Sequence, residues 1–154
     1  MASMFHEDCV LLNIEAYDKY EILSKLSDTL YRRGFVKDTF KQAVIDREEK
    51  FPTGLRLLSM GVAIPHTDAV HVNQTSVGVA VLKNPVRFSL MGSQGENVPV
   101  SIIFMLAMGD GQKQLEMLTK LIEFFQREEE LKKMQRMTSE KEVVTFLESE
   151  LLKN

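Results

Sequence analysis

The chain has 154 residues, of which 44% are hydrophobic; it can enclose one core but is too short for two ordinary domains. The formal net charge is -3, from 19 Lys and Arg against 22 Asp and Glu, and without any basic cluster we expect no nucleic acid partner. The acidic N-terminus MASMFHEDCV and the lack of a long apolar stretch predict a cytoplasmic protein with no membrane insertion.

The N-terminal segment predicts one strand. The continuous apolar run CVLLNI, residues 9–14, is typical of a buried strand. Cys9 lies inside this run, so we expect a small buried hydrophobic residue rather than a reactive thiol. His6 precedes the strand and is expected in a frayed terminus.

Two helices are predicted to follow this strand. Asp18, with Glu21 three residues later, forms a capping-box pattern that opens a helix ending at Gly34. Asp38 is the expected N-cap of a second helix, TFKQAVIDREEK. That helix must end just before Pro52, because proline disfavours helical geometry in the residue that precedes it.

Extended segments dominate the middle of the chain. The apolar residues VAI lead to His66, and TSVGVAVL, residues 75–82, predicts a buried strand. We expect a turn at Asn84 and Pro85, after which VRF pairs back onto that strand. The long apolar run VPVSIIFMLAM, residues 98–108, predicts a central strand covered on both faces.

The last third of the chain is predicted to be helical. Ser139 and Glu142 form a capping box that opens the final helix. An earlier helix, after the glycines that follow the central strand, is predicted from apolar residues at helical spacing: Leu115, Leu118, Leu121, Ile122 and Phe125. Strands interleaved with helices predict an α/β layer fold with a largely buried sheet.

His66 is the first candidate for chemistry. Pro65 has a fixed φ and no N–H, so it directs His66 out of the apolar segment at a strand end, where sites in α/β folds gather. A lone histidine is otherwise more often a structural residue that forms hydrogen bonds. That alternative predicts that His66 can be replaced without loss of function.

A metal site at this loop is not expected. His66 and His71 are five positions apart with Asp68 between them, whereas helical ligand pairs are separated by four. No cysteine or glutamate cluster accompanies them.

A nucleophilic imidazole needs one neutral nitrogen and an acceptor that holds the other N–H. A backbone carbonyl or Asp68 could be that acceptor. If the group transferred is phosphoryl, its oxygens also need a fixed cation, for which a planar guanidinium is well suited. Arg47 is the candidate, although an arginine at a helix end is commonly solvated or paired with the helix dipole.

Two motifs carry a resemblance to a known family. REEKFPTG, residues 47–54, followed by GVAIPH, residues 61–66, resembles the EIIA domain of the sugar phosphotransferase system, in its fructose/mannitol superfamily. The FPTG variant looks closest to the galactitol-type branch, and the similarity runs over nearly the whole chain. It implies a mixed β-sheet flanked by helices on both faces, in one EIIA domain over residues 1–154.

The resemblance also implies a function. His66 would accept a phosphoryl group from the phosphohistidine of HPr and pass it to a cysteine of EIIB, with the membrane component EIIC as an indirect partner. Arg47 would match the family's active-site arginine, and Thr53 the threonine of the turn, acting through its hydroxyl or by holding the loop. Such transfer requires alignment and charge stabilisation but no cofactor, metal or nucleotide.

One position departs from the pattern of many mannitol- and fructose-type relatives. Those relatives place a second histidine at the start of the helix after the central strand, in an H-L-x-x-L context. Here the context reads QLEML, with Gln114 at that position. Glutamine can donate and accept hydrogen bonds but cannot take up a proton, so we expect the site to work without a second imidazole.

Two partners must reach the same nitrogen, so we expect His66 in a shallow depression with an apolar rim. Met60, Val62 and Met91 are the candidates for that rim. The alternative function is a regulatory phosphoprotein of the same fold, in which phosphorylation is a signal that controls a transcription factor or a transporter.

Overall fold

The protein is built on one mixed five-stranded sheet with the strand order β1-β4-β5-β3-β2. The computed structural model describes residues 3–93 and 95–152. β4 and β5 form the antiparallel centre, β1 and β3 add to them in parallel, and β2 closes the edge antiparallel to β3. The strands are β1 (Phe5–Ile14), β2 (Gly54–Arg56), β3 (Gly61–Ala63), β4 (Ser76–Ser89) and β5 (Asn97–Ala107).

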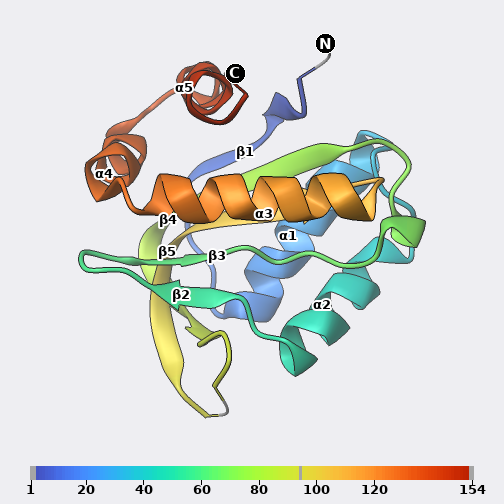
Figure 1. Ribbon diagram of the computed structural model, residues 1–154, viewed down its shortest axis with the longest axis horizontal. Helices are drawn as coiled ribbons and strands as arrows, with labels where there is room; N and C mark the ends of the chain where they lie inside the picture. Colours follow the sequence, from blue (N-terminus) through green and yellow to red (C-terminus); the bar gives the residue numbers. More distant parts are fainter. Residues whose placement is uncertain (1–2, 94, 153–154) are drawn as a thin grey trace.

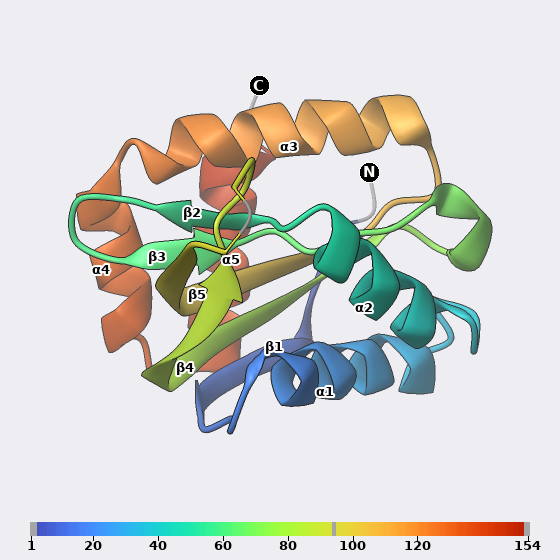
Figure 2. The ribbon, with the colours of Figure 1, turned by 90° about the horizontal axis from the view of Figure 1, so that it is seen from below.

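Helices cover both faces of this sheet, as expected (Figures 1 and 2). In Figure 2, α3 runs along the top and α1 along the bottom, with α2 beside α1 at the right. None of the helices in the described ranges is long and apolar enough to cross a membrane. The helices are α1 (Lys19–Arg32), α2 (Phe40–Lys50), the 3-10 turn η1 (Ala69–His71), α3 (Gly111–Phe125), α4 (Glu128–Arg136) and α5 (Glu140–Leu151).

β5 separates the two halves of the core. Successive side chains of a strand point to opposite faces, so Phe104 packs with the helices α3, α4 and α5, whereas Met105 packs with α1 and α2. Both side chains are fully buried, and burying such a side chain contributes about 1.5–3 kcal/mol. The central strand predicted over residues 98–108 is therefore confirmed, and it fixes the sheet between two layers of helices.

Local signals set most of the helix ends. The Asp18 carboxylate accepts a hydrogen bond from the Glu21 N–H at 3.0 Å, and Ser139 Oγ accepts one from the Glu142 N–H at 3.2 Å, so both predicted caps are confirmed. The prediction for α2 is wrong by one residue. Thr39 occupies the N-cap position, and its side chain makes no capping hydrogen bond.

The turn predicted at Asn84 and Pro85 is wrong. β4 continues through both residues to Ser89, and the VRF segment belongs to the same strand, where it pairs with β5. The ladder shifts its register between Val81 and Val86. A bulge of this kind accommodates a proline that cannot donate to the ladder, and Pro85 is exposed there.

Two further expectations were wrong in detail. His6 lies within β1, where its ring packs on Phe35 with 4.7 Å between centroids, and is not part of a frayed end. In α3, Leu121 and Phe125 are buried as predicted and Leu118 packs against the core, but Leu115 and Ile122 are exposed. Met117 and Phe124 complete the buried face. Cys9 is fully buried, as expected, and burial raises the pKa of its thiol to about 11.

Gly61 is required by close packing between β3 and β5. A Cβ at this position would lie 2.2 Å from the Pro99 carbonyl oxygen, a backbone atom. We expect Gly61→Ala to lower the free energy of unfolding by about 1–3 kcal/mol, measured by chemical denaturation. Gly111→Ala is the control, because a Cβ there meets nothing within 4 Å. Equal stability of the two variants would contradict this account.

Candidate active site

His66 lies where two parallel strands end. β3 finishes at Ala63, and the chain continues alongside β5, where the Leu106 N–H donates to the Pro65 carbonyl at 2.9 Å. His66 and Leu106 form an isolated parallel bridge at this point. The backbone of the loop is thus fixed to the central strand, and the half-buried His66 side chain emerges at the edge of the sheet.

The hydrogen bonding of His66 determines its tautomer. Its Nδ1 lies 2.7 Å from the Ile64 carbonyl oxygen, which can only accept, so Nδ1 carries the proton and Nε2 carries the lone pair. The pKa of His66 lies below its ordinary value, mainly because the ring is buried. The positive charge of Arg47 also lowers this pKa, whereas the hydrogen bond to the Ile64 carbonyl and the negative charge of Asp68 raise it. The lowered pKa favours the neutral ring, whose nucleophilic nitrogen lies on the side away from Ile64.

Arg47 supplies a cation next to this ring. It lies in the last turn of α2, and its guanidinium packs over the Phe51 ring at 5.3 Å. Arg47 Nη1 is 3.9 Å from Asp68 Oδ1, a long ion pair between partly exposed groups that contributes little to stability. Within the described part of the chain, the buried Nε has no hydrogen-bond partner. The guanidinium therefore has donors to offer to an anion.

Thr53 holds the loop and does not present its hydroxyl to solvent. Only 4% of the residue is exposed. Its hydroxyl donates to Glu48 Oε1 at 2.8 Å and accepts from the Ile64 N–H at 3.1 Å. Of the two roles that the sequence left open for Thr53, the structure favours the second.

Gln114 lies in the first turn of α3, the helix that follows β5, and His66 forms its bridge to Leu106 near the end of that strand. Its backbone N–H bonds to the carbonyl of Asp110, the N-cap residue. The side-chain Oε1 is buried and makes no hydrogen bond within residues 3–93 and 95–152. Gln114 thus keeps one buried acceptor that is unpaired among the described residues.

The structure excludes one of the three residues expected in the apolar rim. Val62 is fully buried in the core and cannot take part, whereas Met91 is 40% exposed and Met60 is partly buried. The large exposed apolar side chains that adjoin Arg47, Asp68 and Gln114 in the chain are Phe51, Val70 and Leu115.

The His71 side chain contacts the residue that precedes α2. Its Nδ1 lies 2.8 Å from Thr39 Oγ1, at the start of α2. In the part of the chain that the structure describes, no group of three or more His, Cys, Asp or Glu side chains is arranged to hold a metal ion.

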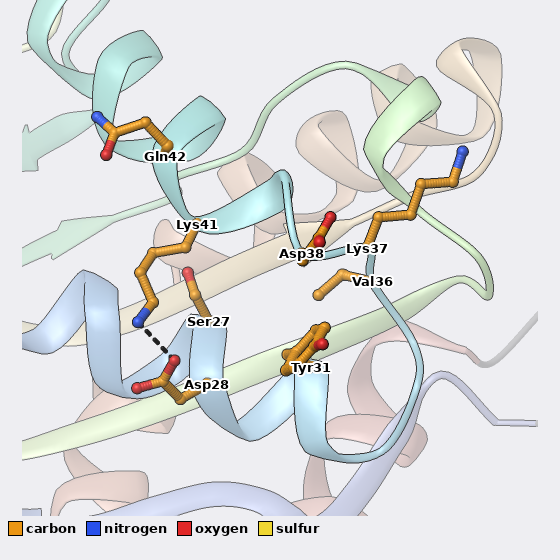
Figure 3. A pocket seen from close by; sticks show the side chains of 8 residues that line it. All are labelled: Ser27, Asp28, Tyr31, Val36, Lys37, Asp38, Lys41 and Gln42. Carbon is orange, nitrogen blue, oxygen red and sulfur yellow. Dashed lines mark ion pairs between the residues drawn. The ribbon is translucent and has the colours of Figure 1, made fainter.

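A hollow of about 370 Å³ lies between α1 and α2, separate from these residues (Figure 3). Asp28 and Tyr31 line it from α1, and Lys41 and Gln42 from α2. The Lys41 amine is 2.6 Å from the Asp28 carboxylate, so its charge is already paired. None of the predicted site residues lines this hollow.

Glu48, which no sequence motif pointed to, is only 2% exposed. Its carboxylate accepts from both the N–H and the hydroxyl of Thr53, each at 2.8 Å. Burial raises the pKa of Glu48 to about 7. The available signal was its spacing: Phe40, Val44 and Glu48 recur every four residues along α2, so the glutamate continues the buried face of the helix.

Comparison with known proteins gives three relevant matches. The galactitol-specific EIIA component of Escherichia coli K12 is 33% identical over 105 residues, 68% of this chain and 69% of that protein. Transcriptional regulator ManR of Bacillus subtilis is 29% identical over 139 residues, 90% of this chain and 20% of the regulator. The Escherichia coli complex of enzyme IIAMTL with phosphorylated enzyme IIBMTL matches with a TM-score of 0.75 and 23% identity, covering 96% of this chain and 98% of that one.

The solved structure shows that the mixed sheet and its two helix layers form the fold of the mannitol enzymes. The galactitol relative carries the similarity into the sequence itself. A family model, described as the phosphoenolpyruvate-dependent sugar phosphotransferase system, EIIA 2, matches residues 3–150. The chain therefore belongs to the EIIA 2 family of the sugar phosphotransferase system, a phosphotransferase component of sugar transport.

Proposed function

We propose that His66 is the phosphoryl carrier of this EIIA protein. It takes the group from the phosphohistidine of HPr and passes it to a cysteine of EIIB. The observation that carries this proposal is the bond of 2.7 Å between His66 Nδ1 and the Ile64 carbonyl, which leaves the Nε2 lone pair available at the sheet edge.

In the first step the Nε2 lone pair forms a bond to phosphorus as the bond between phosphorus and the donor nitrogen breaks. The electron pair of the broken bond returns to the histidine of HPr. Positive charge develops on the ring of His66. The Ile64 carbonyl, which accepts the hydrogen bond from Nδ1–H, stabilises this charge. In the second step a cysteine thiolate of EIIB attacks phosphorus, and Nε2 is the leaving group.

Arg47 stabilises the transferring group. Its charge already acts on His66, and its partly exposed guanidinium is held by a long ion pair to Asp68, which an incoming phosphoryl group can displace. Between transfers, Asp68 is the carboxylate with which Arg47 pairs weakly. Gln114 can accept or donate one further hydrogen bond at the same edge.

The proposed partners follow from this chemistry and from the relatives. HPr and EIIB must approach the same nitrogen in turn, and the exposed side chains of Phe51, Val70 and Leu115 offer an apolar rim for both. The similarity to the galactitol-specific component favours a galactitol-type system, in which a membrane EIIC binds the sugar.

The test follows the phosphoryl group to its destination. We expect the wild-type protein, incubated with phosphoenolpyruvate, enzyme I and HPr, to gain one phosphoryl group and to lose it when a cognate EIIB is added. Mass spectrometry at neutral pH measures both proteins. An EIIB whose cysteine is replaced by serine is the control and should leave the label on EIIA. No uptake of label would contradict the proposal.

A regulatory phosphoprotein is the second candidate. The similarity to ManR, a transcriptional regulator of which this chain matches a fifth, favours it. In that case the protein takes up phosphoryl from HPr in the same experiment, but the label stays on His66 in the presence of EIIB. The lifetime of the phosphorylated form therefore distinguishes the two functions.

A further inference from the structure

A continuous chain of hydrogen bonds links the interior of the protein to His66. It begins at the buried Glu48 carboxylate, which accepts two bonds from Thr53. The Thr53 hydroxyl in turn accepts from the Ile64 N–H, and the Ile64 carbonyl accepts from His66 Nδ1. Each link is between 2.7 and 3.1 Å long, and Glu48 and Thr53 are buried.

The donor and the acceptor of each hydrogen bond in this chain can be assigned. An ionised carboxylate only accepts, so it fixes the proton of the Thr53 hydroxyl toward Glu48. A lone pair of the same oxygen is then free to hold the Ile64 N–H. Because the Ile64 backbone is held in place, its carbonyl oxygen points toward the His66 ring. A carbonyl in this position accepts the hydrogen bond from Nδ1–H and so stabilises the tautomer with the proton on Nδ1.

We propose that Glu48 is a positioning residue for phosphoryl transfer, which acts through Thr53 and Ile64 to hold His66 in the tautomer and orientation that expose Nε2. This inference rests on the proposed function of His66. Glu48 does not touch the transferred group, because it is buried behind Thr53.

Protonation of Glu48 loosens the chain. A neutral carboxyl carries its own O–H, which must be accommodated beside Thr53, where both the N–H and the hydroxyl already donate toward Glu48. One of the two bonds is then lost or reversed. The hold on the Ile64 N–H weakens, and the proton of His66 becomes less strongly confined to Nδ1.

The surroundings of Glu48 place its protonation near neutral pH. Burial raises its pKa to about 7, opposed by the two bonds from Thr53 and by Lys19, the charged group that faces it from α1. Since the pKa lies above its ordinary value of 4.5, the native state holds a proton that the unfolded chain loses between about pH 4.5 and pH 7. The contribution of Glu48 to stability therefore falls as pH rises through that window.

The test compares the wild-type protein with Glu48→Gln, which is isosteric and permanently neutral. Imidazole ¹⁵N chemical shifts of the unphosphorylated chain report the tautomer of His66 between pH 6.5 and pH 8.5. In the wild type, we expect the proportion of the Nδ1-protonated form to rise as pH passes about 7. In Glu48→Gln it stays at the low-pH value, which changes the tautomer ratio at pH 8 by roughly three- to tenfold, the effect of one net hydrogen bond.

Matched variants separate positioning from general destabilisation. Glu49→Gln removes the neighbouring exposed carboxylate, which bonds to the Tyr20 hydroxyl, and should leave the tautomer ratio unchanged. Thr53→Val should reproduce the change seen in Glu48→Gln, whereas Thr53→Ser, which keeps the hydroxyl, should not. Chemical denaturation should also show that Glu48→Gln lacks the loss of stability that the wild type undergoes between about pH 4.5 and pH 7.

An unchanged tautomer ratio with an unchanged pH dependence in Glu48→Gln would overturn the inference. The measurement needs no phosphoryl donor, so it is independent of whether HPr phosphorylates the protein. Failure of the wild type to accept phosphoryl contradicts the proposed function, whereas failure of Glu48→Gln to shift the tautomer contradicts the positioning role alone.

Discussion

His66→Ala is expected to fold normally and to accept no phosphoryl group from HPr. The substitution removes the nitrogen that forms the bond to phosphorus. The imidazole is half-buried and bonds only to the Ile64 carbonyl in the described structure, so its loss leaves the core intact. Mass spectrometry at neutral pH, with phosphoenolpyruvate, enzyme I and HPr, measures the expected complete loss of label.

His71→Ala is the matched control for this prediction. His71 lies five residues further along the same segment, and its ring bonds to the Thr39 hydroxyl. We expect His71→Ala to be labelled like the wild type. An acid-labile label that persists in His66→Ala and disappears in His71→Ala would transfer the carrier role to His71.

Arg47→Ala is expected to slow phosphoryl transfer by roughly a thousandfold, by analogy with other arginines placed on a transferring phosphoryl group. Positive charge at this point is most valuable when negative charge spreads over the phosphoryl oxygens in the transition state. Rapid-quench measurement of transfer from phosphorylated HPr determines the rate. The pKa of His66 should rise in the variant, because the Arg47 charge lowers it.

Two further variants show whether geometry or charge alone matters at Arg47. Arg47→Lys keeps the charge but loses the planar fork, so we expect it to recover only part of the rate. Lys50→Ala removes an exposed cation from the last turn of the same helix and should transfer phosphoryl at the wild-type rate. A wild-type rate in Arg47→Ala would remove this residue from the site.

The sequence predicted His66 and the cation beside it because their signals are local. Pro65 follows the apolar strand β3, and Arg47 lies in the last turn of α2, just ahead of the FPTG segment. Glu48 was missed because a charged residue within REEK reads as part of a solvated face. Its burial depends on Thr53, whose N–H and hydroxyl satisfy the carboxylate only after the chain has folded back.

The errors in the fold have the same origin. Asn84 and Pro85 carry a strong turn signal, but pairing with the long β5 strand overrides it and converts the turn into a bulge. Helical spacing identified α3 and placed Leu118, Leu121 and Phe125 correctly on its inner face, but it also assigned Leu115 and Ile122 to that face, whose width depends on where the sheet lies. Capping at Asp18 and Ser139 was predictable because each cap involves residues only three apart.

The attachment of the His66 loop to its neighbours also bears on how quickly the protein can exchange partners. Pro65 is tied to Leu106 and Ile64 to Thr53 before any partner arrives, so an encounter has little chain left to order. Binding then loses little conformational entropy, and even a weak, short-lived complex can be productive. A protein that shuttles between two partners benefits from this. A small preorganised surface can bind each partner productively and still dissociate rapidly, so that release of the partner does not limit turnover.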